Sequence, residues 1–318
     1  MEESYRSRYE KLKRQRKQRQ RKIIIVAVLG LCLLIVAIIG IQSLLSPSPP
    51  LEILEEERPS LETNVPTRSI SVTEVEDTFH LELVNFQYPL RRSINYDSFA
   101  IAFPNVPAQS AYTQLYAPAL QAIDTWFRRG QAEGIADFFL ASGYRDIQQQ
   151  TELYYAAQNN ESQISTPGEI EDPSFVNAPG HSEHHTGLAA DIAVPGVLLR
   201  EMAGTPAALW LEETAWEYGF IKRYTEGTSR ITGIAHEPWH FRFVGQPHAH
   251  YIFQNNLVLE QYLSHLRANG VTQISFHGQL YEVWHQIPYQ GQIYVPALLP
   301  FTVSSDNMGG FIVTVTLG

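Results

Sequence analysis

Two short segments of the chain carry side chains that together could form a metal-dependent hydrolytic centre. One, SEHHTGLAAD, contains His184 and Asp191; the other, EPWH, contains Glu237 and His240. A hydrolytic zinc ion needs about three protein ligands, one position open to water, and a nearby carboxylate that handles the protons of that water. The two histidines and Asp191 can supply the ligands, which leaves Glu237 free for proton transfer.

The second segment also matches a different zinc pattern. His236 and His240 flank Glu237 as in H-E-x-x-H, where both histidines bind the metal from one turn of a helix. That arrangement would need a helix through Pro238, and a proline inside a helix costs about 3 kcal/mol and restricts the residue before it. The alternation of FRFV after His240 also favours a strand. We therefore expect His240 to be the ligand, Glu237 the base and His236 a neighbour.

Helices and strands must bring the two segments together. Apolar residues recur at helical spacing over residues 112–129, and Gly130 is expected to end that helix. Further helices are predicted at residues 147–158, 206–218 and 257–268. Strands are predicted at FHLELVNF, at FFLASGY, over residues 234–244, and as two pairs within residues 270–318. The expected fold class is α+β: a small, mainly antiparallel sheet with packed helices and the zinc site at one face.

The N-terminal part of the chain predicts a membrane anchor. Residues 1–22 hold ten Lys or Arg against three Glu, and Ile23–Ile41 is an unbroken run of apolar residues and glycine. About 20 apolar residues cross the ~30 Å core of a bilayer, and basic residues before the run place the N-terminus in the cytoplasm. A cleaved signal peptide is the alternative, but its apolar region is usually ~7–15 residues long. We expect a single-pass plasma-membrane protein whose catalytic domain is extracytoplasmic.

Five regions follow from these patterns. They are a cytoplasmic basic segment (1–22), a transmembrane anchor (23–45), a Pro- and Glu-rich stalk without a core (46–78), a catalytic domain with its lead-in (79–269), and a β-rich C-terminal appendage without a chemical motif (270–318). Residues 23–318 hold 13 basic and 30 acidic residues. This excess of negative charge repels the phosphate backbone of nucleic acids, so no nucleic-acid partner is expected.

The motifs resemble those of a known family. ASGYRDIQQQ (141–150), GHSEHHTGLAADI (180–192) and GFIKRYTEGTSRITGIAHEPWHFRFVG (219–245) occur in the order and spacing typical of VanY-type D-alanyl-D-alanine carboxypeptidases. These are zinc peptidases of the lysostaphin/D-Ala-D-Ala metallopeptidase superfamily. The resemblance spans about residues 110–265, and it leaves the stalk and the C-terminal appendage outside.

The resemblance implies the same metal ligands that the residue types suggest, with one zinc ion per chain. It further implies that Arg145, Gln150 and Ser182 line the substrate site. A guanidinium such as that of Arg145 suits the binding of an oxyanion or a carboxylate. Trp239, between the base and the third ligand, is expected to form a pocket wall.

The expected function is that of a membrane-anchored zinc carboxypeptidase. Its substrates would be peptidoglycan stem peptides, from which it removes the C-terminal D-alanine. L,D-carboxypeptidase activity, peptidoglycan endopeptidase activity and non-catalytic binding of the cell wall are the alternatives on the same scaffold. A penicillin-sensitive serine carboxypeptidase is excluded, because no lysine has a serine three positions before it, as S-x-x-K requires.

Overall fold

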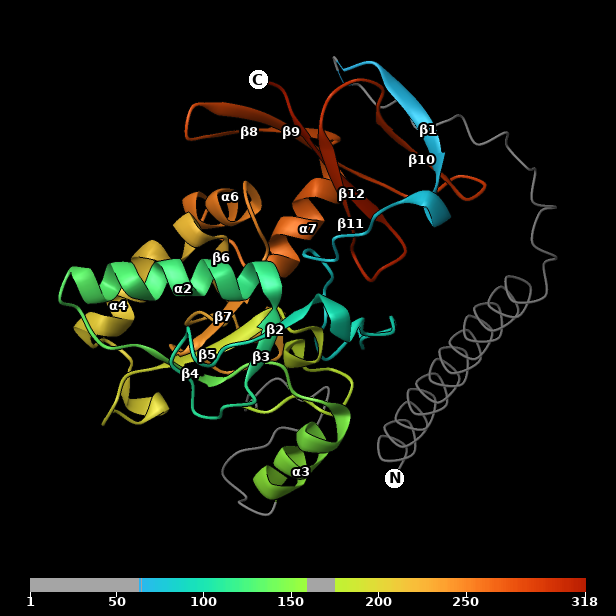
Figure 1. Cartoon of the computed structure of the whole chain (residues 1–318). Coiled ribbons are helices and arrows are strands. Elements are labelled where there is room, and N and C mark those ends of the chain that lie inside the picture. Colours follow the sequence, from blue (N-terminus) through green and yellow to red (C-terminus); the bar gives the residue numbers. More distant parts are fainter. Residues whose placement is uncertain (1–62, 64, 159–174) are drawn as a thin grey trace, which may run out of the picture. The chain divides into compact units, whose positions relative to one another are not determined.

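Four antiparallel strands form the sheet that carries both candidate metal-binding segments (Figure 1). Their order is β4 (Phe139–Ser142), β5 (Ala189–Ala193), β7 (His240–Phe243) and β6 (Phe220–Lys222). Every residue of the two central strands, β5 and β7, is buried. In their register Asp191 lies opposite His240, although 49 residues separate the two in the chain. Strand pairing therefore brings two of the expected metal ligands together.

The computed structural model describes residues 63, 65–158 and 175–318. The expected cytoplasmic segment, membrane anchor and most of the stalk lie outside these residues. Within the described ranges, no helix is long and apolar enough to cross a bilayer.

Helix α2 (Ala117–Ala132) packs along the sheet through an apolar stripe centred on Trp126. The ring of Trp126 lies 5.3 Å from that of Phe241 in β7, and its Nε1 donates a hydrogen bond to Oγ1 of Thr214 at 2.8 Å. Thr214 ends α4 (Pro206–Thr214), so this bond joins two helices beside the sheet. The fully buried indole is thus satisfied at its polar end and packed on the strand that carries His240.

Both predicted ends of this helix are wrong. Gln114–Tyr116 form strand β3, which pairs with β2 (Phe99–Ile101), and the helix begins only after it, with a proline in its first turn. Gly130 lies inside the helix, where a Cβ atom would sit 2.6 Å from the ring of Phe138. The absence of a side chain at Gly130 therefore lets the ring of Phe138 pack closely against the helix. Gly134, at φ +72°, is the residue that takes the left-handed conformation after the helix.

The other predicted helices are confirmed, with small shifts. They are α3 (Ile147–Gln158), α4 with its 3₁₀ extension Ala215–Tyr218, and α7 (Leu259–Ala268). The short helices α5 (Ser229–Thr232) and α6 (His248–Gln254) were not predicted. The strand predicted at FHLELVNF is wrong: the amide of Glu82 bonds to the carbonyl of Phe79 in a turn, and that of Leu83 bonds to the carbonyl of Asp306.

The C-terminal segment forms a second antiparallel sheet, as predicted. Its strands are β11 (Phe301–Ser305), β12 (Phe311–Thr316), β9 (Gln279–Gln286) and β8 (Val271–Phe276), in that spatial order. An additional strand, β10 (Gln292–Pro296), pairs with β1 (Thr67–Ser71). The stalk prediction is therefore wrong for the residues of β1, because cross-strand pairing with a distant segment gives them a partner that local composition does not reveal.

The C-terminal sheet shares a hydrophobic cluster with the rest of the described structure. Tyr262 of α7, Ile221 of β6 and Leu81 belong to this cluster together with Val283 and Ile312 of the sheet. Helix α7 lies between the two sheets in Figure 1. Residues 270–318 thus contribute to a common core, which an isolated appendage would not do.

Candidate active site

One pocket of about 290 Å³ is lined by all eight side chains that the sequence singles out. They are His184, Asp191, His240, Glu237, Arg145, Gln150, Ser182 and Trp239. The remaining walls are mostly apolar, with Leu153, Phe175, Val176, Leu199 and Ile234 among them. The structure therefore brings these eight side chains together from three separated parts of the sequence, residues 145–150, 182–191 and 237–240.

His184, Asp191 and His240 form a group whose candidate ligand atoms all lie within 4.8 Å of one another. Oδ2 of Asp191 is 3.3 Å from Nε2 of His184, and Oδ1 is 3.0 Å from Nδ1 of His240. Ligands at about 2.0–2.1 Å in a tetrahedral zinc site lie roughly 3.3 Å apart. The donor types and their spacing therefore fit zinc.

The loop that carries His184 owes its shape to a glycine. Residues Glu183–Thr186 form a 3₁₀ turn that ends at Gly187, which has φ +71°. A Cβ atom on Gly187 would also lie 2.6 Å from the ring of Phe99. Only glycine satisfies both the left-handed backbone and this close approach, which places His184 beside the start of β5.

Each histidine of the group has a defined partner for its second ring nitrogen. Nδ1 of His184 lies 2.6 Å from the carbonyl oxygen of Gly143, and Nε2 of His240 lies 3.5 Å from Oε2 of Glu183. Such contacts fix the tautomer and the ring orientation of a metal-binding histidine. His184 therefore presents Nε2, and His240 presents Nδ1, to Asp191.

The charges in this group reflect burial and the nearby partners. Burial opposes ionisation of Asp191, but His184 and His240 outweigh it and hold the pKa of the carboxyl well below its usual range. Burial also opposes the charged form of His240, yet its hydrogen bonds to Asp191 and Glu183 raise its pKa to about 9 in the metal-free protein. Metal binding at Nδ1 must then release a proton.

Glu237 lies just before β7 and faces the same group. Its Oε2 is 3.6 Å from Nδ1 of His240, and the residue is buried. Burial raises its pKa to about 8 in the metal-free protein, with the charge of Asp191 acting in the same direction and that of His240 against it. A carboxyl group with a pKa near neutrality is suited to accept a proton and return it.

The alternative H-E-x-x-H arrangement is not what the structure contains. Residues 235–239 form no helix, and β7 begins at His240. His236 is only partly buried, does not line the pocket, and has no hydrogen-bond partner at Nε2 among the described residues. Pro238 explains this geometry, since it keeps Glu237 out of helical backbone angles.

Arg145 is held at the pocket wall by three contacts. Its guanidinium donates to Oε1 of Gln150 at 2.7 Å and to Oγ of Ser142 at 3.1 Å, and Nη2 lies 3.6 Å from Oδ2 of Asp191. Gln150 in turn donates to the carbonyl of Asn177 at 2.6 Å. The positive charge is therefore positioned beside the candidate metal ligands His184, Asp191 and His240, referred to below as the metal-ligand group, while part of the guanidinium faces the pocket.

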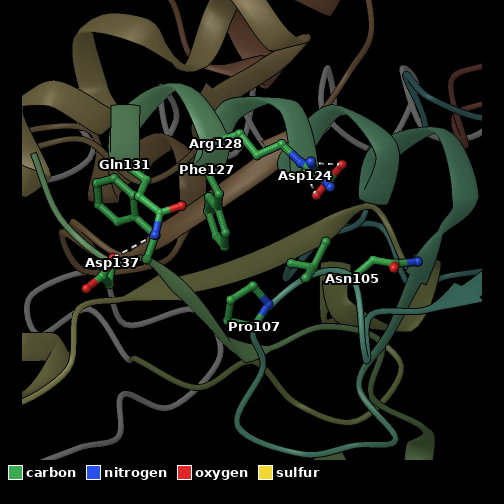
Figure 2. A pocket seen from close by; sticks show the side chains of 9 residues that line it. Asn105, Pro107, Asp124, Phe127, Arg128, Gln131 and Asp137 are labelled. Atoms are coloured by element: carbon green, nitrogen blue, oxygen red, sulfur yellow. Dashed lines mark hydrogen bonds and ion pairs between the residues drawn. The ribbon is translucent and has the colours of Figure 1, made fainter. Parts of the chain in front are cut away.

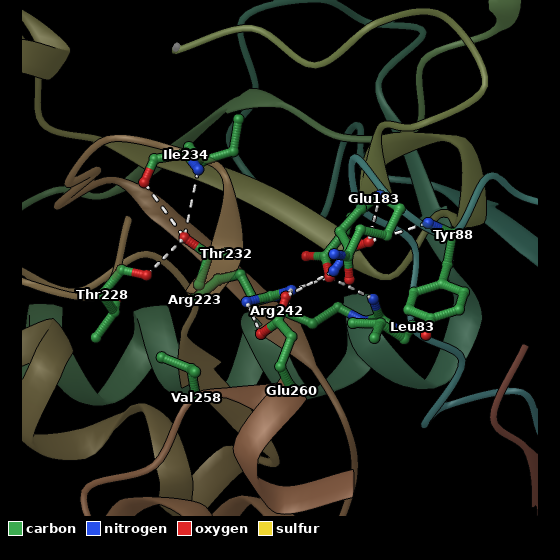
Figure 3. Close-up of polar contacts among 12 residues, drawn as sticks. Leu83, Tyr88, Glu183, Arg223, Thr228, Thr232, Ile234, Arg242, Val258 and Glu260 are labelled. Atoms are coloured by element: carbon green, nitrogen blue, oxygen red, sulfur yellow. Dashed lines mark hydrogen bonds and ion pairs between the residues drawn. The ribbon is translucent and has the colours of Figure 1, made fainter. Parts of the chain in front are cut away.

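A buried charged cluster that was not predicted from the sequence lies behind the pocket (Figure 3). Glu183 accepts hydrogen bonds from Arg223 and Arg242, both fully buried, and Arg223 also binds Glu260. Burial opposes ionisation of Glu183, but the two guanidinium groups outweigh it and hold its pKa well below its usual range. The available signal was Arg242, a charged residue within the otherwise apolar strand HFRF, which needs a buried partner.

A second cavity, of about 230 Å³, lies between α2 and residues 105–107 (Figure 2). It contains none of the predicted site residues. Its charged groups are already paired: Arg128 binds Asp124 at 2.9 Å, and Gln131 donates to Asp137 at 3.3 Å. Nothing in its lining indicates a ligand.

Comparison with known proteins agrees with the family suggested by the motifs. A family model described as VanY: D-alanyl-D-alanine carboxypeptidase matches residues 113–246. The D-alanyl-D-alanine carboxypeptidase of Enterococcus faecium is 37% identical over 186 residues, which cover 58% of this chain and 56% of that protein. The chain thus spans little more than half the length of this relative.

Two further relatives are covered almost completely. The bifunctional D-Ala-D-Ala dipeptidase and D-Ala-D-Ala carboxypeptidase VanXYC of Enterococcus gallinarum is 32% identical over 193 residues, which cover 58% of this chain and 94% of that protein. The crystal structure of the vancomycin resistance D,D-dipeptidase VanXYg, in complex with a D-Ala-D-Ala phosphinate analogue, aligns with a TM-score of 0.65 and 26% identity. That alignment covers 80% of this chain and 100% of the other, and it supports the α+β fold with antiparallel sheets.

Proposed function

The chain belongs to the VanY family of D-alanyl-D-alanine carboxypeptidases, and we propose that it is a zinc carboxypeptidase that removes the terminal D-alanine from peptidoglycan stem peptides. The observation that carries the proposal is the single pocket in which the group His184, Asp191 and His240 faces both Glu237 and Arg145. A bound zinc ion would supply Lewis-acid polarisation of the scissile carbonyl and would lower the pKa of water.

In this proposal Glu237 moves the proton. It accepts a proton from the attacking water as the water oxygen bonds to the carbonyl carbon of the scissile amide. The same carboxyl then delivers that proton to the amide nitrogen as the carbon–nitrogen bond breaks. The products are free D-alanine and a peptide with a new C-terminal carboxylate.

The other pocket residues would bind and orient the peptide. Arg145, fixed by Gln150 and Ser142, offers its guanidinium to the developing oxyanion or to the carboxylate of the substrate. Ser182 is buried in the lining and can hydrogen-bond the peptide. Trp239, whose ring stacks on that of Phe175 with centroids 6.3 Å apart, forms an apolar part of the pocket lining. VanXYg binds a D-Ala-D-Ala phosphinate analogue, which supports a substrate of this class.

Digestion of cell-wall material tests the proposal against its alternatives. Purified, zinc-loaded protein is incubated with peptidoglycan, and the products are identified by mass spectrometry. The proposal requires stem peptides shortened by one D-alanine together with free D-alanine. Loss of the C-terminal D-alanine from tetrapeptides would instead indicate L,D-carboxypeptidase activity, and loss of cross-linked dimers would indicate an endopeptidase. Binding to the wall without any product would indicate a non-catalytic wall protein.

We also propose that the catalytic domain acts outside the cytoplasm, held at the plasma membrane by residues 23–45. This rests on the apolar run and on the ten basic residues that precede it. In cells, the full chain should remain with membranes after a high-salt wash, and an added protease should reach residues 79–318 once the wall is removed. Recovery of only a shortened soluble form would favour a cleaved signal peptide.

A further inference from the structure

Glu183 separates His240 from two arginines. The residue is 1% exposed, and both guanidinium groups donate to the same carboxylate oxygen, Oε1: Nε of Arg223 at 2.8 Å and Nη1 of Arg242 at 2.8 Å. The second oxygen, Oε2, lies 3.5 Å from Nε2 of His240, at the long end of hydrogen-bond distances. The two oxygens of this carboxylate are therefore divided between the arginines and the histidine, as Figure 3 shows for the arginine side.

The two arginines are themselves fixed. Arg223 donates two hydrogen bonds to Glu260, at 2.9 and 2.7 Å, and Arg242 donates to the backbone carbonyls of His80 and Glu82, at 3.1 and 2.8 Å. Neither arginine is exposed to solvent. Two carboxylates and two guanidinium groups therefore balance in charge within this buried cluster.

The backbone places this cluster directly behind the metal-ligand group. Arg242 follows His240 by two residues in β7, so both side chains belong to the same strand. The amide of Arg223 donates to the carbonyl of His240 at 3.2 Å, and Glu183 precedes the ligand His184. Any change in the position of Glu183 would therefore alter its contact with Nε2 of His240.

We propose that Glu183 is a positioning residue for His240: it accepts the Nε2 proton and holds the ring so that Nδ1 points at the zinc. The proposal rests on the metal site described under the proposed function. An imidazole that donates from one nitrogen presents a lone pair at the other, and a carboxylate acceptor makes that lone pair more basic. His184 differs, because its second nitrogen faces the neutral carbonyl of Gly143.

A pair of matched variants tests the proposal in the whole chain of residues 1–318. In Glu183→Gln the amide oxygen remains with the arginines, so its NH₂ group faces His240 and favours the opposite tautomer, with a proton on Nδ1. Zinc affinity, measured by competition with a chelator, should fall about 10–100-fold, the usual effect of losing such a partner. Glu260→Gln removes a carboxylate from the same cluster without touching His240. It should lower the thermal stability of the metal-free protein and leave zinc affinity close to that of the wild type.

Ring-nitrogen NMR of the zinc-loaded wild type provides a test that needs no variant. The proposal predicts a zinc-bound Nδ1 and a protonated Nε2 in His240, with the reverse in His184. Zinc on Nε2 of His240, or equal zinc affinity in Glu183→Gln and wild type, would overturn the inference and leave the proposed function intact. A wild-type protein that binds no zinc would overturn both.

Discussion

Replacing Glu237 by glutamine should remove the proton-transfer group and leave the structure of the pocket unchanged. The residue is 5% exposed, and its Oε2 lies 3.6 Å from Nδ1 of His240. Glutamine keeps this shape and cannot accept a proton. A positioned proton-transfer group is worth about 10²–10⁴-fold in rate. At 1.36 kcal/mol per tenfold, this corresponds to about 2.7–5.4 kcal/mol of activation free energy.

We expect a loss near the upper end of that range, because the pocket offers no substitute base among its described lining residues. Asp191 is the other carboxylate there, and each of its oxygens contacts a histidine. Tyr224 is no alternative, since burial raises the pKa of its hydroxyl well above the ordinary value of 10.

The same substitution should not weaken the fold of the metal-free protein. Because burial raises the pKa of Glu237 from 4.5 to about 8, its contribution to stability is lost as the pH rises through that interval. Glutamine does not titrate, so thermal unfolding with a chelator present should show the variant at least as stable as the wild type at pH 8. At pH 5 the two should differ less.

The assay for the Glu237→Gln prediction has two parts. Release of D-alanine from a stem peptide gives kcat, and elemental analysis of the purified protein gives the zinc content. We expect about one zinc per chain with kcat reduced as stated. Near-normal kcat at full zinc occupancy would refute the assignment of Glu237 as the base, whereas loss of zinc would show that it acts as a ligand.

Three further predictions concern the metal, inhibition and acid stability. Asp191→Ala should lose both zinc and activity while His236→Ala keeps both, and the opposite metal contents would restore the H-E-x-x-H hypothesis. A chelator should abolish activity and zinc should restore it, whereas a β-lactam should not inhibit; persistent activity in protein shown to be free of metal would contradict the mechanism. Burial opposes the ionisation of Asp306, but hydrogen bonds from His285 and from the amides of Gly310 and Met308 outweigh it. They lower the pKa of the carboxyl from 3.8 to about 2. Its stabilisation is therefore present above about pH 4 and lost as the pH falls toward 2, so Asp306→Asn should lower the free energy of unfolding by about 2 kcal/mol at pH 7 and by little at pH 2 in denaturant titrations. Equal effects at both pH values would contradict this.

The grouping of His184, Asp191 and His240 in one pocket could be predicted because these residue types are constrained by chemistry that is visible locally. His184, Asp191 and His240 have donor side chains in segments whose small or apolar neighbours predict buried turns and strands. Pro238 was enough to exclude the helical alternative, and the structure places His236 outside the pocket. Spacing alone could not supply the distances, which arise from the pairing of β5 with β7.

The parts that escaped prediction depend on partners distant in sequence. Strand β1 lies in a Pro- and Glu-rich region, and its pairing with β10 joins segments more than 200 residues apart, as the register of Thr67 with Pro296 shows. Glu183 has the same difficulty: its arginines come from β7 and from the residue after β6. A buried charge can be recognised in a sequence, but the identity of its partner depends on the fold.

The most direct test of the account uses one synthetic stem pentapeptide that ends in D-Ala-D-Ala. The zinc-loaded chain of residues 1–318 is incubated with it, and the products are quantified by mass spectrometry, with the same peptide ending in L-alanine as the control. We expect one equivalent of free D-alanine and the corresponding tetrapeptide, with the control peptide left intact. Release of the dipeptide D-Ala-D-Ala as the sole product, equal cleavage of the control, or no cleavage by protein that carries its zinc would contradict it.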